Sequence, residues 1–381
     1  MDKLIAHARK RNHNQEELQT LQEHSCNVAK LCAVTCEWIG LEKTGLLIGL
    51  LHDMGKASQD VQEHILGKNP QKLNHCSAGM HWLWEHKRKQ RFTDYIIAQM
   101  ACLAIGCHHS GRCDYIAPDG GEPWLDRMYS ERAMVRYNES VQAFFANCCE
   151  EEQILTLINQ TAEEFSAFEE RVRNKIQAKY NPKLKNDVFW TTYRFQMGFI
   201  QRFLFGALVD ADWTDTSCYM NQTSLLQPIS LDERQKIWNQ LSEKTEEYLK
   251  KLPCKYAIDE LRQEISDQCF AAAQKCTPGI YRLYVPTGGG KTYSGFRFCM
   301  EMARRQNASH IFYFAPYKSI TCQNADCIRK VLGNEFVLEH HSDVIFGDED
   351  KEEKSQWIAL SQRWQGVPVI CTTMVQLLKR L

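Results

Sequence analysis

The sequence predicts a mainly helical region followed by an α/β region with a parallel sheet, because two patterns divide the chain. Through about the first 220 residues, apolar residues recur at three- and four-residue spacing, as on one face of a helix. After Pro278, short β-rich runs alternate with helical patterns, which indicates parallel strands joined by crossover helices. We therefore expect two domains, residues 1–225 and 226–381, with the boundary near Pro228.

The composition narrows the class of protein. Among 381 residues, 44% are hydrophobic and 24% are charged, which excludes a mainly disordered or collagen-like chain. Lys and Arg number 46 against 47 Asp and Glu, so the chain is not a globally basic nucleic-acid binder. No apolar run suits a signal peptide or a bilayer span, and we expect a cytoplasmic protein without membrane contact. The 17 cysteines include no Cys-x-x-Cys pair, which predicts reduced, packed thiols rather than structural zinc.

The first region is expected to be almost entirely helical, since strand-like alternation is hard to find in it. Residues 28–35 and 46–51 carry apolar side chains at helical spacing. Residues 188–209 are apolar nearly all round, which predicts a central helix buried by its neighbours. Residues 118–123, which read PDGGEP, predict a surface loop.

The second region begins with two polar, charge-mixed helices, expected over residues 231–251 and 256–276. A further helix is expected over residues 293–305. The expected strands are three short runs: Tyr281–Val285, His310–Phe314 and Val367–Cys371.

A His-Asp pair follows the apolar helix that ends at Leu51. His52 and Asp53 place an imidazole and a carboxylate within reach of one cation, and Gly55 permits a tight turn. Lys56 can hydrogen-bond a carboxylate or a bound phosphate. A single His-Asp dipeptide is weak evidence, because such pairs occur often by chance.

Further imidazoles and a carboxylate strengthen this pattern. Such a mixture suits manganese, iron, cobalt, nickel or zinc better than calcium, which prefers oxygen ligands alone. Each histidine taken singly is more often a surface or capping residue. The set makes that interpretation improbable: His24, His75, the doublet His108-His109, and Asp212, with Asp210 as a neighbouring alternative.

This order of residues resembles the HD phosphohydrolase superfamily, and more narrowly the HD nuclease domain of the CRISPR-associated helicase-nuclease of type I systems. The resemblance extends over essentially the whole chain. The matching stretches here are Glu23–Ser25, Leu50–Lys56, His75–Gly79, Ile105–Gly111 and Ala211–Trp213.

The resemblance implies a hydrolase of antiviral defence that degrades single-stranded DNA. It implies two divalent transition metal ions, such as Mn, Ni, Co or Fe, and recruitment by the Cascade surveillance complex with its guide RNA. Asp53 would bridge the two metals, with His52 and Lys56 beside it in the catalytic centre. His24, His52 and Asp212 would complete one metal site, and His75, His108 and His109 the other.

A glycine-rich loop over residues 285–292 stands between an expected strand and an expected helix, the context that a phosphate-binding loop requires. Its backbone N–H groups would surround phosphates, Lys291 would reach the β and γ phosphates, and Thr292 would offer its hydroxyl to magnesium. The P-T-G-G-G-K-T form resembles superfamily-two helicases and indicates an incomplete RecA-like domain. The expected nucleotide-binding residues are Thr287, Gly288, Gly289, Gly290, Lys291 and Thr292.

Three later segments, residues 315–320, 338–342 and 371–373, also resemble this helicase family. The complete helicase uses Mg-ATP, and its acidic magnesium motif would lie beyond Leu381. We therefore expect this chain alone neither to hydrolyse ATP nor to unwind DNA, although weak nucleotide binding stays open.

Alternatives to the nuclease remain at this point. The HD residues could serve a phosphohydrolase acting on nucleotides or cyclic nucleotides, or the chain could be an inactive regulatory fragment. The basic run at residues 87–91 is either a solvated helix end, which we favour, or a track for DNA phosphates.

Overall fold

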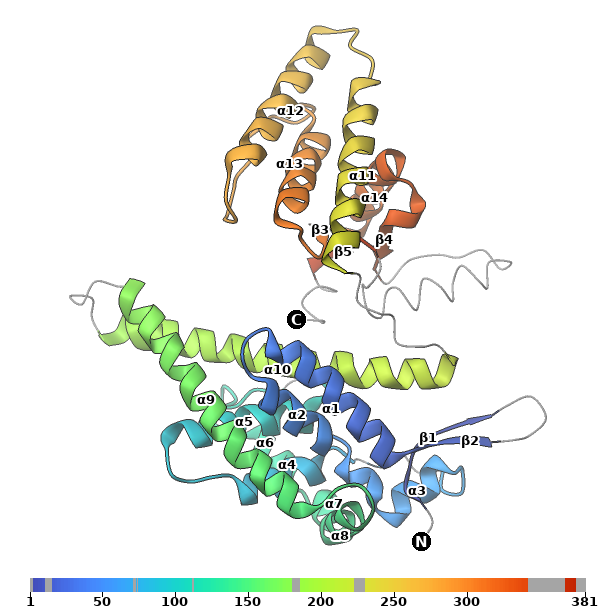
Figure 1. The fold of residues 1–381 in the computed structure, drawn as a ribbon, viewed down its shortest axis with the longest axis vertical. Helices are drawn as coiled ribbons and strands as arrows, with labels where there is room; N and C mark the ends of the chain where they lie inside the picture. Colours follow the sequence, from blue (N-terminus) through green and yellow to red (C-terminus); the bar gives the residue numbers. More distant parts are fainter. Residues whose placement is uncertain are drawn as a thin grey trace. The chain divides into compact units, whose positions relative to one another are not determined.

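The structure is a computed structural model that describes residues 3–10, 16–70, 73, 75–111, 113–179, 186–222, 230–341 and 367–374. Contacts within the chain divide it into two compact units, residues 1–225 and 226–381. The described chain is mainly helical, with a small parallel sheet in the second unit (Figure 1). The predicted fold class is confirmed at this level. No helix in the described ranges is long and apolar enough to cross a membrane.

The first unit is a helical assembly around one apolar core. Thr20 caps the first helix, since its side chain accepts a hydrogen bond from the backbone N–H of Glu23 at 3.1 Å. Trp82, Trp124 and Phe144 are among the largest fully buried side chains. The long helices are α1 (Leu21–Glu37), α2 (Glu42–Leu51), α4 (Ser77–His86), α5 (Phe92–Cys107), α9 (Glu151–Lys179) and α10 (Asn186–Asn221). The other helices are η1 (Met54–Ala57), α3 (Gln59–Ile65), α6 (Pro123–Tyr129), α7 (Glu131–Met134) and α8 (Tyr137–Asn147).

An antiparallel hairpin precedes these helices, which corrects the expectation of an almost entirely helical region. Its strands are β1 (Ile5–Lys10) and β2 (Glu16–Thr20). Gln62 of α3 holds the hairpin, because its side chain exchanges two hydrogen bonds of 2.8 Å with the backbone of Ile5. A two-stranded ribbon needs such tertiary support, so its local sequence carries a weak signal.

Helix α10 is amphipathic, and the expectation that it is buried all round is wrong. Leu204 and Leu208 are fully buried, whereas Phe195 is 73% and Phe199 57% exposed. A high apolar content therefore does not mean that the helix is buried on all sides, since only one face of α10 packs on the core. The expected surface loop before α6 is exposed, as predicted.

The second unit contains a three-stranded parallel sheet in the order β3-β5-β4. Strand β5 pairs in register with both neighbours, so that Val369 lies opposite Ile311 on one side and Val337 on the other. Helices pack around this sheet, and Trp238 and Phe296 are among their buried residues. The elements are β3 (Ile311–Ala315), β4 (Val337–His340), β5 (Val369–Thr373), α11 (Leu231–Lys250), α12 (Ala257–Lys275), α13 (Lys291–Gln306), α14 (Lys318–Leu332) and η2 (Asn334–Phe336).

The three helices expected in this unit and two of its three strands are confirmed to within about three residues. The expected strand at residues 281–285 is wrong: this segment forms no strand, and the side chain of Tyr284 is 82% exposed. Aromatic and β-branched residues favour a strand only where a neighbouring strand pairs with them. Strand β4 was not foreseen, because four residues are too few for a clear alternation.

Candidate metal centre and phosphate loop

Five segments of the first unit bring the seven predicted metal-binding residues together. His24 lies within α1, and Asp212 lies within α10. His52 and Asp53 follow the end of α2, His75 precedes α4, and the His108-His109 doublet follows the end of α5. The side chains form two groups that could each hold a metal ion, with ligand atoms within 4.8 Å of one another inside each group. The groups are His24, His52, Asp53 and Asp212, and His75, Cys76, His108 and His109.

The first group is sealed from solvent. The Nε2 atom of His24 lies 3.3 Å from Asp53 Oδ2 and 3.3 Å from Asp212 Oδ1. His52 Nε2 lies 3.3 Å from the same Asp53 oxygen. Asp212 is 4% exposed and the other three are fully buried, whereas Asp210 is exposed and takes no part in this group.

The second group lies against the other oxygen of Asp53. His75 Nε2 is 3.4 Å and His108 Nε2 is 3.6 Å from Asp53 Oδ1. His109 Nε2 approaches His75 Nε2 at 2.9 Å, and the His109 side chain is exposed. Asp53 therefore has one carboxylate oxygen in each group, as a carboxylate that bridges two cations does.

Hydrogen bonds on the far side of three imidazoles direct their Nε2 atoms into the centre. His52 donates its Nδ1 proton to the carbonyl of Gly49 at 2.7 Å, and His108 donates to Ile105 at 2.6 Å. The Nδ1 atom of His24 lies 2.7 Å from a carboxylate oxygen of Asp215. These contacts select the tautomer whose Nε2 lone pair faces inward, the arrangement typical of metal-binding histidines.

The inward-facing atoms fit divalent cations. Both oxygens of Asp53 and the Nε2 atom of His108 are buried without a hydrogen bond of regular geometry. The Nε2 atoms of His24 and His52 face each other at 3.3 Å, and two lone pairs at that distance need a proton or a cation between them. Mixed imidazole and carboxylate donors suit first-row transition metals.

When no metal is bound, protonated imidazoles in the first group balance the charges of its carboxylates. Burial lowers the pKa of His24, but hydrogen bonds to Asp212, Asp215 and Asp53 outweigh it and raise the pKa to about 10. Burial likewise lowers the pKa of His52, but the Asp53 charge and the Asp212 contact raise it to about 9. Burial opposes ionisation of Asp53 and Asp212, yet the neighbouring imidazoles hold the pKa of both carboxyl groups well below the usual range.

In the second group, the pKa values of the imidazoles are lowered rather than raised. Burial is the main cause that lowers the pKa of His75 to about 3 and that of His109 to about 4. Burial also raises the pKa of Cys76 to about 12. Both imidazoles are therefore neutral near pH 7, with lone pairs available to a metal.

Lys56 and Gly55 complete the turn around Asp53. The Nζ atom of Lys56 is 2.6 Å from Asp53 Oδ2, and the residue is 5% exposed, so its partner in this structure is a carboxylate. A Cβ atom on Gly55 would lie 2.1 Å from the carbonyl oxygen of His75. Glycine is required here by the close approach of two segments rather than by a left-handed turn, which corrects the reason given from the sequence.

Two neighbours of His24, Asp215 and His7, are not predicted by the sequence motifs. Asp215 also accepts hydrogen bonds from Gln19 at 2.7 Å and from Asn27 at 2.8 Å, which fixes its position. The ring of His7, on the unforeseen strand β1, lies edge-on to His24 with 4.7 Å between centroids. Asp215 lies three residues after Asp212 on α10, and this helical spacing was the one available signal.

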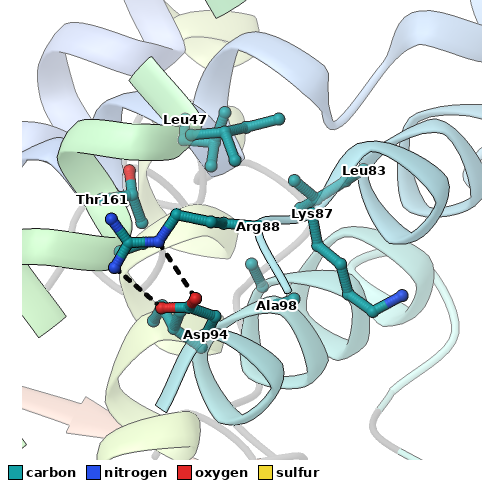
Figure 2. A pocket seen from close by; sticks show the side chains of 11 residues that line it. Leu47, Leu83, Lys87, Arg88, Asp94, Ala98 and Thr161 are labelled. Carbon is teal, nitrogen blue, oxygen red and sulfur yellow. Dashed lines mark hydrogen bonds and ion pairs between the residues drawn. The ribbon is translucent and has the colours of Figure 1, made fainter. Parts of the chain in front are cut away.

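The basic run after α4 is engaged in packing. Figure 2 shows Arg88 paired with Asp94 at a small pocket lined by Leu47, Ala98 and Thr161. The two Arg88–Asp94 hydrogen bonds are each 3.0 Å long, and the Asp94 side chain is fully buried. Lys87 lies over the Trp84 ring at 3.6 Å. This geometry argues against a track for DNA, but Arg88 is only 9% exposed, so the favoured prediction of a solvated helix end is wrong for this residue.

The predicted phosphate loop lies at the start of α13 in the second unit. Gly288 and Gly290 have φ angles of +86° and +81°, and Gly290 caps the helix. Lys291 and Thr287 are exposed, and Gly289 is buried. A glycine turn that leads into a helix N-terminus presents backbone N–H groups to an anion.

Two side chains outside the loop contact it. Arg262 of α12 donates a hydrogen bond to the Gly288 carbonyl at 2.8 Å. The hydroxyl of Thr292 lies 3.4 Å from Asn324 Oδ1 of α14. Of the later helicase-like segments, residues 315–320 join β3 to α14 and residues 371–373 lie in β5. The segment 338–342 is described through His341, and Ser342 lies outside the described residues.

Comparisons with known proteins give one family match and several similar solved structures. Residues 253–367 match the family of the type III restriction enzyme res subunit, ResIII. The crystal structure of T. fusca Cas3-ATP is 14% identical with a TM-score of 0.41, and covers 98% of this chain and 43% of its own. The AMPPNP form is 13% identical with a TM-score of 0.43, and covers 98% and 44%. The chain thus spans less than half the length of these proteins. The chain is similar to these Cas3 structures, and its second unit carries the ResIII match.

Proposed function

We propose that residues 1–225 form an HD-type nuclease domain that uses two divalent transition metal ions to cleave single-stranded DNA. The observation that carries this proposal is the position of Asp53, whose two carboxylate oxygens face two separate groups of imidazoles. A single-metal site has no need of this arrangement. A phosphodiester hydrolase with two metals requires it, because both cations must lie close to one scissile phosphate.

The chemistry follows from the donor set. Two cations held here would polarise the phosphate, provide hydroxide near neutral pH and stabilise the leaving oxygen. The protein holds the imidazoles in the correct tautomer through the Nδ1 contacts of His24, His52 and His108. Lys56 neutralises part of the charge of Asp53. No nucleophilic serine or cysteine is needed in this mechanism.

The direction of substrate access follows from burial. The His75 side chain is 18% exposed and His109 is exposed, whereas His24 and His52 are fully buried. We place the DNA phosphate at the His75–His109 end of the centre. The buried end offers no path for a polymer, since His24, His52 and Asp212 are at most 4% exposed.

We also propose that the second unit binds Mg-ATP through the loop 287–292, as part of a superfamily-two helicase motor. The support is the glycine turn at the start of α13 together with the ResIII match over residues 253–367. The presence of both motif sets in one chain supports a role in CRISPR interference, with the Cascade surveillance complex and its guide RNA as partner. This assignment places the protein in the cytoplasm.

A nuclease assay on circular single-stranded DNA tests the proposed activity. The chain is stripped of metal, reloaded with Mn²⁺ or Ni²⁺, and compared with the variants Asp53→Ala and Asp210→Ala. We expect metal-dependent cleavage that Asp53→Ala abolishes and that the exposed Asp210→Ala retains. Cleavage that survives Asp53→Ala would overturn the mechanism. Release of phosphate or pyrophosphate from nucleotides, with DNA left intact, would favour the phosphohydrolase alternative.

A further inference from the structure

A third group of metal-binding side chains lies in the second unit, apart from the HD-type residues. Cys322, Glu339 and His341 place their ligand atoms within 4.8 Å of one another. The thiol Sγ atom lies 3.2 Å from His341 Nε2, and that nitrogen lies 2.6 Å from Glu339 Oε1. The three side chains therefore converge on one point from two secondary-structure elements.

Strand geometry and helix geometry explain this convergence. Glu339 lies in β4 and His341 directly follows the strand, and their side chains meet at 2.6 Å. Cys322 lies on α14, which packs against β4 and β5. The hydroxyl of Thr372 donates a 2.7 Å hydrogen bond to the carbonyl of His340, which fixes the backbone between the two strand ligands.

An outer contact orients the carboxylate. Arg329 donates a hydrogen bond of 2.7 Å to Glu339 Oε2, so the other oxygen, Oε1, is turned toward His341. Arg329 follows Cys322 by seven residues and therefore lies on the same face of α14. His341 is 4% exposed, and Cys322 and Glu339 are partly buried. Such a site excludes bulk water from the ligands but leaves a path for an ion.

We propose that Cys322, Glu339 and His341 form a zinc site that fastens the end of β4 to α14. A thiolate with an imidazole and a carboxylate is a donor set for zinc and is too soft for magnesium or calcium. Three protein ligands leave a fourth tetrahedral position for water. The site is independent of the proposed nuclease, because it shares no residue with either HD-type group.

Binding at this site replaces a proton. The thiol of Cys322 loses its S–H proton to water, and the sulfur lone pair forms the bond to zinc; no oxidant or reductant is involved.

The helix that carries Cys322 also contacts the phosphate loop. Asn324 is two residues after Cys322 on α14, and it contacts the hydroxyl of Thr292. A cation that holds α14 against β4 would therefore steady the helix from which Asn324 reaches the loop. Zinc would act here as a structural element of the motor, not as part of its chemistry.

Cobalt substitution of the full chain tests the site. We expect Co²⁺ to produce a near-ultraviolet thiolate-to-metal band that is lost in Cys322→Ser and retained in two controls. Cys76→Ser removes the thiol of the HD-type centre, and Cys327→Ser removes another thiol of α14. Bound zinc, counted by native mass spectrometry, should fall by one ion per chain in Cys322→Ser and in His341→Ala. A band and a zinc count that are unchanged in Cys322→Ser would overturn the proposal.

A second measurement needs no variant and therefore does not depend on the folding of one. Alkylation of Cys322 by iodoacetamide is followed by peptide mass spectrometry in the wild-type chain, with and without one added equivalent of zinc above the HD-type sites. We expect zinc to slow alkylation of Cys322 at least about tenfold while Cys254, which is exposed, reacts at the same rate. Equal alkylation of Cys322 with and without zinc would contradict the site.

Discussion

Asp53 turns one carboxylate oxygen toward His24 and the other toward His75. The distances are 3.3 Å from Oδ2 to His24 Nε2 and 3.4 Å from Oδ1 to His75 Nε2. Because the carboxylate is fully buried, this division cannot be an accident of surface rotamers. One side chain therefore links the two groups of imidazoles, and changes near either group are expected to affect both.

Asp215→Asn should weaken metal binding without removing a ligand. The carboxylate contacts Nδ1 of His24 at 2.7 Å, and such outer contacts typically change metal affinity by about 10–100-fold. Calorimetric titration with Mn²⁺ measures the change, and excess Mn²⁺ should restore nuclease activity. Asp210→Asn, in an exposed residue of the same helix, is the control. Equal affinities of wild type and Asp215→Asn would show that the contact does not position His24.

The metal-free domain should be most stable near pH 6.5 and should lose stability on either side of that pH. His24 and His52 have pKa values raised to about 10 and about 9, so their contribution is fully present below the unfolded value of 6.5 and is lost as the pH rises through 9–10. His75 and His109 have pKa values lowered to about 3 and about 4, so stability falls as the pH drops below 6.5. The depressed pKa values of Asp53 and Asp212 add to the loss at acid pH.

Thermal unfolding of the chelator-treated chain from pH 4 to pH 10 measures this profile. Loading with Mn²⁺ provides the control, because a bound cation replaces the protons of His24 and His52 and should remove the alkaline loss. If the midpoint temperature of unfolding of the metal-free chain rises steadily to pH 10, the proposed protonation states of the histidines are wrong.

Lys291→Ala should reduce the affinity for Mg-ATP. The exposed ammonium group at the start of α13 is placed for the phosphates, and a hydrogen bond to a charged group contributes about 1.5–3 kcal/mol, or roughly 10–100-fold in affinity. Fluorescence titration with a labelled ATP analogue follows the loss. Lys330→Ala on the exposed face of α14 should bind like the wild type. Identical affinities for all three proteins would show that the loop does not bind the nucleotide.

Asp94→Ala should destabilise the first unit strongly. The fully buried carboxylate accepts two hydrogen bonds from Arg88, and its loss leaves a guanidinium group that is 9% exposed without this partner. Breaking a buried pair in this way costs about 3–5 kcal/mol. Urea unfolding measures the difference. Glu163→Ala removes a carboxylate that is 57% exposed, and this change should cost less than about 1 kcal/mol. Similar losses in both variants would contradict the assigned roles.

The sequence predicted α11, α12 and α13 to within about three residues, but the expectation that α10 is buried all round was wrong. It failed where a partner elsewhere in the chain decides the structure. The β1–β2 hairpin depends on Gln62, and the run Tyr281–Val285 has the composition of a strand but pairs with none in the described chain. Composition alone cannot specify which strand lies beside which.

The candidate site could also be predicted only in part. His52 and Asp53 are adjacent in the sequence, so their motif could be found by inspection. Asp215 acts through a hydrogen bond to His24, and no motif records such a contact. Cys322 and His341 are separated by 18 residues and two elements, and only the packing of α14 on β4 brings them together.

The unequal burial of the two imidazole groups should also affect the rates at which metal ions enter and leave them. The ligands of an ion among His24, His52 and Asp212 are at most 4% exposed, whereas an ion beside His109 borders solvent. We expect the enclosed ion to exchange more slowly and to leave last, with a residence time set by local opening of the fold rather than by ligand exchange. Brief chelation would then yield a singly loaded enzyme, inactive but quickly restored by one added equivalent of metal.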